Sequence, residues 1–366
     1  MGVMQVPAVR LRYAQRLFAG MSLLVTAALL QGCGDSSAPA GGADAASASG
    51  PPAVDSKGCT VYGDPPRPTV SLSPDGTLNA AIALLANACL TMGGETLKWT
   101  DPDGNPRTAC MVVPPQASAQ KPVPMLVWLH PTLLAQDSIL ATGLPKLVRT
   151  GDLSGDPANP GFILLLPLGR DIKQFLPAPL NTGIGWDHWY RNLDRSSPYL
   201  NVDVAAIDYF ISVPEQRGIV DTKRVYMSGW SEGADMSTLY GLDTNGIAAT
   251  GVYSTITPFA DPADPCPGPA FATNQRPYYL MVRECDAGDA CDLGQQFLNQ
   301  LRGGVLPAAD VSGVILDFAT KPVAMCNSAC NGSNPAYGSE EQYEHTHWPQ
   351  PWNDNLLGFM RDNAEP

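Results

Sequence analysis

The sequence predicts an α/β fold in which helices cover both faces of a mostly parallel sheet. Short apolar runs of strand length alternate with segments of helical periodicity, an alternation typical of parallel sheets. A glycine-flanked serine stands between one apolar run and the helical segment that follows it. The chain has 366 residues, of which 44% are hydrophobic, and this is enough for a sizeable buried core.

The expected elements follow in chain order. The run 124–129 is almost wholly apolar, as expected of a parallel strand buried on both faces. Asn201 is expected to be the N-cap of one helix, and Asp292, with Gln295 three residues later, the N-cap of another. The expected strands are 107–113, 124–129, 161–167, 224–227, 251–255, 277–282 and 314–318, and the expected helices are 202–213, the stretch after Ser231 through Tyr240, 293–301 and 352–361.

Residues 1–33 have the organisation of a bacterial export signal. Arginines precede the apolar run 17–30, which is too short to span a membrane, and Leu-Gln-Gly-Cys ends the segment at Cys33. This ending resembles the lipobox of bacterial lipoproteins, which implies that Cys33 is lipidated. The alternative is an ordinary signal peptide with an incidental cysteine.

Two regions are expected after the export signal. Residues 34–58 are rich in Ala, Gly, Ser and Pro, as in a flexible tether, and residues 59–366 form one catalytic domain. We therefore expect an exported protein that is lipid-anchored on the periplasmic or cell-surface face of a bacterial membrane, or released from it.

The net charge and the number of cysteines bear on the expected partners and on disulfide bonding. With a net charge of −13, the chain lacks the clustered Lys and Arg that nucleic-acid binding requires, so nucleic acid is not expected as a partner. Eight cysteines besides Cys33 form an even number, which in an exported chain predicts disulfides rather than a metal site. The simplest local pairs are Cys285 with Cys291 and Cys326 with Cys330.

Ser231 lies in Gly229-Trp230-Ser231-Glu232-Gly233, which matches the G-x-S-x-G pattern of a nucleophile elbow. An apolar strand precedes it and helix-forming residues follow it. Glycines on both sides permit the sharp turn that exposes the serine hydroxyl, and the amides at the helix start favour a developing oxyanion. The context favours an α/β-hydrolase with Ser231 as nucleophile over a glycine turn with a solvated serine.

Residues 201–240, which include VDTKRVYMSGWSEGA, resemble polyhydroxybutyrate-depolymerase-like and feruloyl-esterase-like α/β-hydrolases. In that family, a helix and a VD..RVY sequence lead into a GxSxGG elbow. The resemblance implies a serine esterase that needs no metal or organic cofactor, with its triad in the order Ser, acid, His. Glu232 and Ala234 depart from the family, which has a small or amide residue and a second Gly there.

The chain contains only four histidines as candidates for the general base. His130 and His188 precede the elbow, so the triad order leaves His345 and His347. Counted from His347, the aromatic and apolar residues of the last helix fall where related esterases have theirs. We therefore prefer His347 as the base, with His345 as the alternative. A metal site on this H-x-H pair is not expected, because no acidic or cysteine ligand set accompanies it.

Two further segments resemble the same family. Residues 277–286 resemble its PVLLVHGxxD strand and loop, which implies that Asp286 is the triad acid, with Asp289 as the alternative. Residues 126–132 resemble the LVVxLHG strand that precedes the oxyanion loop. Because Pro131 has no N–H, the implied oxyanion donors are the amides of Glu232 and Thr132. His130 is expected to be architectural.

The expected substrate is a carboxylic ester, either a polyester, a feruloyl ester or a small ester. Two alternatives remain: a serine peptidase of the prolyl-oligopeptidase type, and a surface lipoprotein that has kept the fold without the chemistry. The aromatic cluster 185–190 is expected either to line the substrate cleft or to be partly buried core. The proline-rich segment 261–269 either borders the mouth of the site or is a surface loop.

Overall fold

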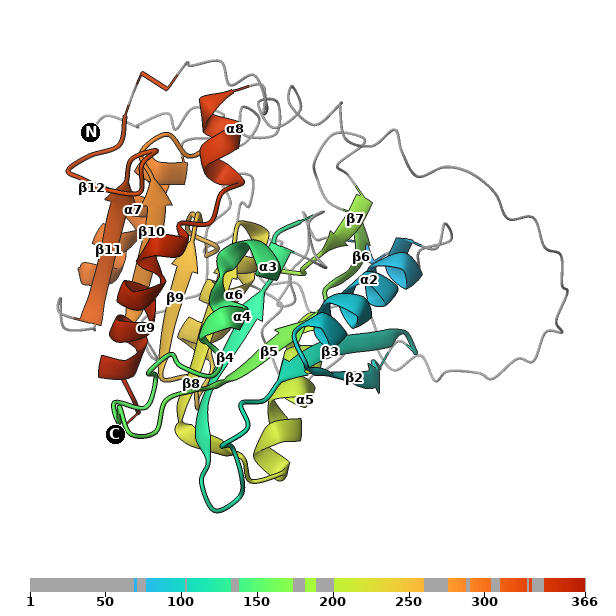
Figure 1. Cartoon of the computed structure of the whole chain (residues 1–366). Helices are drawn as coiled ribbons and strands as arrows, with labels where there is room; N and C mark the ends of the chain where they lie inside the picture. Colours follow the sequence, from blue (N-terminus) through green and yellow to red (C-terminus); the bar gives the residue numbers. More distant parts are fainter. Residues whose placement is uncertain are drawn as a thin grey trace, which may run out of the picture.

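A computed structural model places most of the chain from residue 69 onward (Figure 1). The predicted export signal and tether, residues 1–58, lie outside the residues it describes. Within the described part, none of the helices combines the length and the apolar character needed to cross a bilayer. The described residues are 69–70, 77–102, 104–132, 138–173, 182–188, 201–259, 276–287, 290–303, 310–327, 329–330 and 339–365.

A nine-stranded sheet forms the centre of the structure. The strands from β11 across to β5 are all parallel, whereas β12 and β3 run antiparallel to their neighbours. Central strands such as β4 are buried along their whole length, which explains their continuous apolar sequences. In spatial order the strands are β12 (Pro322–Val323), β11 (Val311–Leu316), β10 (Tyr278–Arg283), β9 (Ala249–Tyr253), β8 (Val220–Trp230), β4 (Val123–Leu129), β5 (Ile163–Pro167), β3 (Pro106–Val112) and β2 (Glu95–Thr100).

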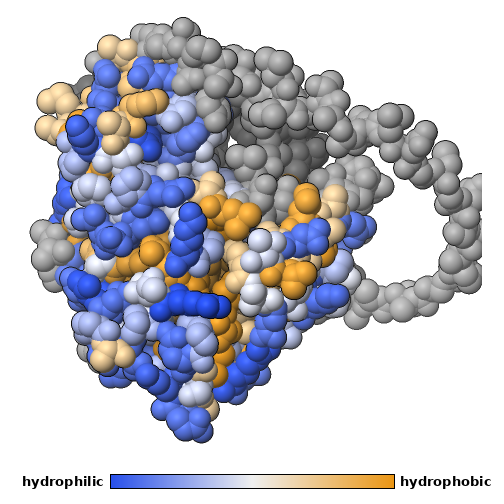
Figure 2. Space-filling view, in the orientation of Figure 1, coloured by the Kyte–Doolittle hydropathy of each residue, from blue (hydrophilic) through white to orange (hydrophobic). Residues whose placement is uncertain are grey.

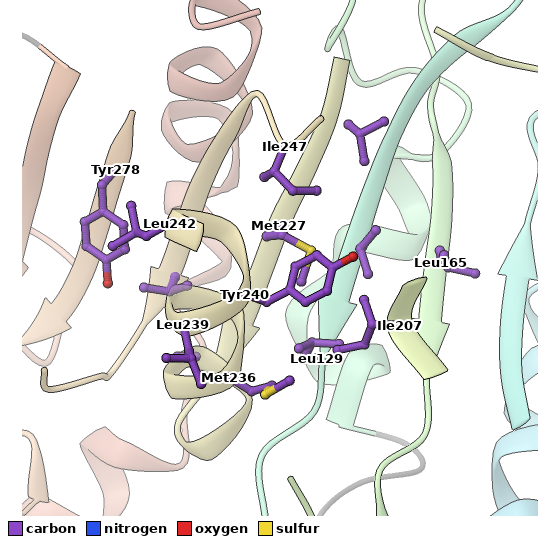
Figure 3. Close-up of a cluster of buried hydrophobic side chains, with 14 of the residues drawn as sticks. Leu129, Leu165, Ile207, Met227, Met236, Leu239, Tyr240, Leu242, Ile247 and Tyr278 are labelled. Atoms are coloured by element: carbon purple, nitrogen blue, oxygen red, sulfur yellow. The ribbon is translucent and has the colours of Figure 1, made fainter. Parts of the chain in front are cut away.

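Helices cover both faces of this sheet, as the sequence predicts (Figure 1). One apolar core lies between the sheet and α5 (Val202–Gln216), α6 (Glu232–Asp243) and α7 (Ala290–Arg302). Figure 3 shows part of this core, where Met236, Leu239 and Tyr240 of α6 face the strands. A second core lies under α2 (Thr77–Thr91), α3 (Ser138–Thr142), α4 (Leu144–Leu147) and α9 (Asn353–Asp362).

Smaller elements complete the described part. β1 (Thr69–Val70), β6 (Arg170–Lys173) and β7 (Thr182–Gly185) form an antiparallel sheet beside α2. α8 (Glu340–His345) and a short 3₁₀ helix (Gln350–Trp352) precede α9. Hydrophilic side chains cover much of the described surface in Figure 2, with apolar ones gathered toward the middle of that face. The strand order and the serine turn after β8 are those of an α/β-hydrolase, which confirms the predicted fold class.

Every predicted strand and helix overlaps an observed element, but several observed elements were not predicted, the longest of them α2 and β2. The exposed Leu84 and Leu90 blur the helical periodicity of α2, since they are 48% and 75% accessible. Asn201 caps α5 as expected, accepting from the amides of residues 203 and 204. The predicted cap Asp292 is wrong: α7 begins earlier, at Ala290, so Asp292 lies inside its first turn.

A buried charge network ties α5 to the sheet. The Asp203 carboxylate accepts hydrogen bonds from Arg107 Nη2 (2.5 Å), Arg170 Nε (3.3 Å) and the Asp187 amide (2.7 Å). Burial opposes ionisation of this carboxyl, but the Arg170 and Arg107 charges outweigh it, and the pKa of Asp203 is lowered. The network therefore ties Arg170 and Asp187 to the start of α5.

We expect Asp203→Asn to lower the free energy of unfolding by about 3–5 kcal/mol, because it leaves buried arginines without their shared counter-charge. Chemical denaturation at pH 7 measures this. Asp354→Asn is the matched control: Asp354 also lies in the first turn of a helix but is exposed, so its loss is expected to stay below about 1 kcal/mol. Equal losses of unfolding free energy in the two variants would mean that Asp203 stabilises the protein only through the helix dipole.

Candidate active site

Ser231 lies at the turn between β8 and α6, with φ 57° and ψ −125°. A non-glycine residue with positive φ is strained, and such strain is typical of a nucleophile elbow. The Ser231 amide donates to the Tyr253 carbonyl (3.1 Å), and the Ser231 carbonyl accepts from the amide of Ala234 (2.8 Å). These bonds hold the serine at the C-terminal edge of the parallel strands.

The two glycines of the motif are required by close backbone contacts. A Cβ at Gly229 would lie 2.2 Å from the Gly233 carbonyl oxygen. A Cβ at Gly233 would lie 2.3 Å from the Leu129 carbonyl oxygen and 2.4 Å from that of His130. The start of α6 is thus packed directly onto the end of β4, which brings the residue after Ser231 close to the predicted oxyanion loop.

The structure brings Ser231 and Asp286 together through His345. Ser231 Oγ lies 2.9 Å from His345 Nε2, and His345 Nδ1 lies 2.7 Å from Asp286 Oδ1. An ionised carboxylate only accepts hydrogen bonds, so Nδ1 carries the ring proton and Nε2 accepts from the Ser231 hydroxyl. All three side chains are therefore arranged as a proton-transfer chain.

The sequence favoured His347 over His345, but the geometry favours His345. The His347 ring instead stacks on Tyr343, with ring centroids 3.9 Å apart, and its Nδ1 donates to the Tyr343 carbonyl (2.7 Å). Counting from the last helix does not decide between the two rings, because both histidines precede the 3₁₀ helix and α9, and the end of α8 sets which ring faces Ser231. His345 is the last residue of α8 and the one that reaches Ser231.

Aromatic side chains donate hydrogen bonds to the backbone around His345. Trp230 Nε1 donates to the His345 carbonyl (2.8 Å), and the Tyr253 hydroxyl donates to the Glu344 carbonyl. Trp348 packs edge-on against Tyr253, with ring centroids 5.6 Å apart. Trp230 and Tyr253 come from the ends of β8 and β9, so His345 is held by the strands that also hold Ser231.

Sequence reasoning missed these partners and also Ser254. Ser254 Oγ lies 2.9 Å from His345 Nδ1, on the same nitrogen that faces Asp286. One signal for Ser254 exists in the sequence: it is the first polar residue after the apolar end of β9, at the sheet edge where α/β proteins place their sites. The Trp230 and Tyr253 bonds need the spatial pairing of distant segments and carry no such signal.

Asp286 follows β10 in a loop tied to the base segment. The preceding amide, that of Cys285, donates to Glu344 Oε2 (2.8 Å). Burial raises the pKa of Glu344 to about 7, with the Asp286 charge adding to the effect. Cys285, directly before Asp286, is therefore held by Glu344, directly before His345.

Disulfides brace the same loop, but not in the predicted pairs. Cys285 is bonded to Cys330 and Cys291 to Cys326, so the local pairs expected from the sequence are wrong. One bridge starts from the loop after β10 and the other from the first turn of α7, and both lead to the segment after β12 instead of closing a short loop. A third bridge, Cys89–Cys110, joins α2 to β3.

His130 is architectural, as predicted. Its Nε2 accepts from the Gly169 amide (2.9 Å), and its Nδ1 donates to the Pro131 carbonyl (2.9 Å). Burial lowers the pKa of His130 to about 4, so the ring stays neutral and keeps both bonds. Trp186 is fully buried against it and donates to the His130 carbonyl (3.0 Å). Trp186 thus belongs to the core.

A buried carboxyl stands beside the predicted oxyanion donors. Glu232 begins α6, directly after Ser231, and its carboxylate accepts a hydrogen bond from the Thr132 hydroxyl. His188 Nδ1 lies 3.7 Å from Glu232 Oε1. Burial raises the pKa of Glu232 to about 7, although His188 and Thr132 act in the opposite direction. The two predicted donor residues are therefore joined through their side chains.

One group of described residues has the spacing of metal ligands: Cys285, Glu340 and Glu344 place ligand atoms within 4.8 Å of one another. The Cys285 sulfur is already bonded to Cys330, which leaves only two carboxyl groups. This set does not fit a metal centre. Several residues named in the sequence analysis lie outside the described residues, namely Cys33, Asp289, Trp189, Tyr190, the segment 261–269 and, among the eight cysteines, Cys59 and Cys266.

Solved structures similar to this chain include a thermostable esterase, with 12% identity and a TM-score of 0.45, covering 74% of this chain and 63% of that one. A ferulic acid esterase has 14% identity and a TM-score of 0.44, covering 73% and 97%. Dipeptidyl peptidase 4 of Porphyromonas gingivalis has 13% identity and a TM-score of 0.41, covering 74% and 35%. This chain thus spans less than two thirds of the thermostable esterase.

No protein-family model matches the chain, and neither does any curated protein. At such low identities and TM-scores, the solved structures do not indicate a substrate.

We expect Gly233→Ala to abolish the soluble fold or to destabilise it by about 3 kcal/mol or more, since two backbone oxygens occupy the space of the new Cβ. Thermal and denaturant unfolding measure this. Gly358→Ala is the control: it lies inside α9, where a Cβ meets only the end of Arg361, and is expected to stabilise by up to about 1 kcal/mol. A fully stable Gly233→Ala protein would contradict the close packing of α6 on β4.

We expect Glu232→Gln to stabilise the protein relative to wild type more at pH 8 than at pH 5. The folded pKa of about 7 exceeds the ordinary 4.5, so the folded state binds the extra proton and wild type loses stability as pH rises between these values. The difference is at most about 3 kcal/mol. Urea unfolding at both pH values measures it. Glu95→Gln is the control, because Glu95 is exposed and pairs with the similarly exposed Arg217, so a much smaller pH dependence is expected. An equal response in the two variants would contradict the burial effect.

Proposed function

We propose that the protein is a serine hydrolase that cleaves carboxylic esters through an acyl-enzyme. The observation that carries this proposal is the continuous hydrogen-bonded chain from Ser231 through His345 to Asp286. The position of Ser231 in a strained elbow at the edge of a parallel sheet adds to it. Ser, His and carboxylate in this relation are the parts that acyl transfer requires.

In the first half of the reaction, the Ser231 hydroxyl attacks the ester carbonyl while His345 Nε2 takes the hydroxyl proton. Asp286 keeps the proton of Nδ1 in place and stabilises the imidazolium that forms. The carbonyl oxygen becomes an oxyanion, for which the amides of Glu232 and Thr132 are the proposed donors. His345 then gives its proton to the departing alkoxide, which leaves as the alcohol.

In the second half, a water molecule attacks the acyl-enzyme and His345 takes its proton. Collapse of the second oxyanion breaks the bond to Ser231 Oγ, and the proton on His345 returns to that oxygen. The products are the carboxylic acid and the free enzyme. No residue of the site needs a metal for these steps, since proton transfer and oxyanion stabilisation come from the protein.

We further propose that the protein is exported and anchored through Cys33. The disulfides support export, because such bonds persist in oxidising compartments. Loss of membrane association and of metabolic labelling by a radioactive fatty acid in Cys33→Ala tests the anchor. Retention of the label would contradict it.

A fluorophosphonate probe tests the catalytic proposal on the full-length chain. We expect labelling of the wild type and none of Ser231→Ala, together with hydrolysis of p-nitrophenyl acetate that the same substitution abolishes. Peptide p-nitroanilides form the second arm of the assay, and their cleavage at a higher kcat/KM than the esters would favour a peptidase. A folded wild-type protein that reacts with neither the probe nor any substrate would overturn the proposal.

The two neighbouring histidines provide a matched pair of variants. We expect His345→Ala to reduce kcat roughly 10³- to 10⁶-fold, because Ser231 loses its base. His347→Ala is expected to reduce kcat by less than about 10-fold, since its ring only stacks on Tyr343 and bonds to a carbonyl. Steady-state kinetics on p-nitrophenyl acetate measure both. The reverse order of effects would show that His347 is the base.

A further inference from the structure

Ser254 is the first residue after β9, and its hydroxyl contacts the ring of His345. It is 3% accessible, and its Oγ is 2.9 Å from His345 Nδ1. Asp286 Oδ1 is 2.7 Å from the same nitrogen. Two oxygen atoms thus contact Nδ1 of the ring, and only one of them, Asp286 Oδ1, belongs to the proposed triad.

The single proton on Nδ1 decides what these partners can do. Because Nε2 accepts from Ser231, Nδ1 carries the ring proton, and both Asp286 Oδ1 and Ser254 Oγ lie where they accept it. One N–H shared between two acceptors resists rotation about the ring axis more than one held by a single acceptor. Swinging the ring away from Ser231 would then break both contacts.

The backbone of Ser254 also has an unusual conformation. Its φ is 61°, in the left-handed region that a residue with a Cβ rarely adopts. Its amide donates to the Met281 carbonyl of β10 (2.9 Å), while the preceding Tyr253 carbonyl accepts from Ser231. The strained conformation places the hydroxyl beside the ring while the backbone on either side remains bonded to neighbouring segments. Glycine would fit this backbone better but would lack the hydroxyl.

We infer that Ser254 is a positioning residue for the proposed hydrolysis, which holds the His345 ring toward Ser231 by sharing the Nδ1 proton with Asp286. The inference rests on the function proposed above. Ser254 does not touch the substrate, and it moves no proton in the reaction. Its effect is on the fraction of time that His345 Nε2 faces the Ser231 hydroxyl, and therefore on kcat rather than on KM.

Two substitutions separate positioning from folding. Ser254→Gly removes the hydroxyl and relieves the strain at positive φ, whereas Ser254→Ala removes the hydroxyl and keeps the strain. We expect both to lower kcat on p-nitrophenyl acetate roughly 3- to 30-fold, with KM nearly unchanged. The melting temperature of Ser254→Gly is expected to equal or exceed that of Ser254→Ala. Wild-type kcat in a folded Ser254→Gly protein would overturn the inference.

A second measurement addresses the shared proton directly. In an Asp286→Ala background, Ser254 is the remaining acceptor at Nδ1, so Ser254→Gly is expected to slow fluorophosphonate labelling by a larger factor than it does in the wild type. An equal or smaller factor would mean that the hydroxyl does not act on Nδ1 and would overturn the inference.

The two proposals fail differently in these assays. If the wild type is not labelled, the hydrolase proposal itself fails. If the wild type is labelled and Ser231→Ala is not, while Ser254→Gly matches the wild type, only the role of Ser254 is wrong.

Discussion

The site depends on the alignment of neighbouring parallel strands at one edge of the sheet. β4, β8, β9 and β10 each end within two residues of the end of the neighbouring strand there, and the residues that follow them supply the proposed oxyanion loop, the proposed nucleophile, a contact of His345 and the proposed acid. Parallel strands present their carboxyl ends on one side, so residues far apart in sequence meet without long connecting loops. His345 is the exception, since it arrives on α8, after the last strand. Its position therefore has to be fixed by contacts from the strand ends.

This dependence explains which parts of the site the sequence could predict. Ser231 and Asp286 follow strands whose apolar patterns and motifs are local, and local patterns locate them. The base follows no strand, and choosing between His345 and His347 required the length of a short helix and a 3₁₀ turn, which no local pattern sets. The disulfides were mispredicted for a similar reason: Cys285 and Cys330 meet only because the segment after β12 folds back over the acid loop. The fold, in contrast, rests on repeated periodicity and was predictable through most of the chain.

Glu232 is a buried carboxyl at the site, and its burial disfavours the charged form. A carboxyl buried at the start of α6 benefits from the helix amides, yet burial still raises its pKa to about 7. The Thr132 hydroxyl compensates in part and also connects α6 to the loop after β4. Pro131 has no N–H, so that loop has one donor fewer. The hydrogen bond between Thr132 and Glu232 limits how far the next amide, that of Thr132, can move. Glu232 is thus linked through Thr132 to the same loop that contains Pro131.

Ser231 and Ser254 both have a positive φ, 57° and 61°, and both directly follow adjacent strands of the sheet. A left-handed conformation for a residue with a Cβ persists only where its surroundings determine it strongly. Here the amide of each serine is bonded across to the neighbouring strand, Ser231 to Tyr253 and Ser254 to Met281. The cooperative stability of the sheet therefore maintains both strained turns. In each turn the strain places a hydroxyl against His345, one at Nε2 and the other at Nδ1, so that a single pair of strand ends controls both nitrogens of the base.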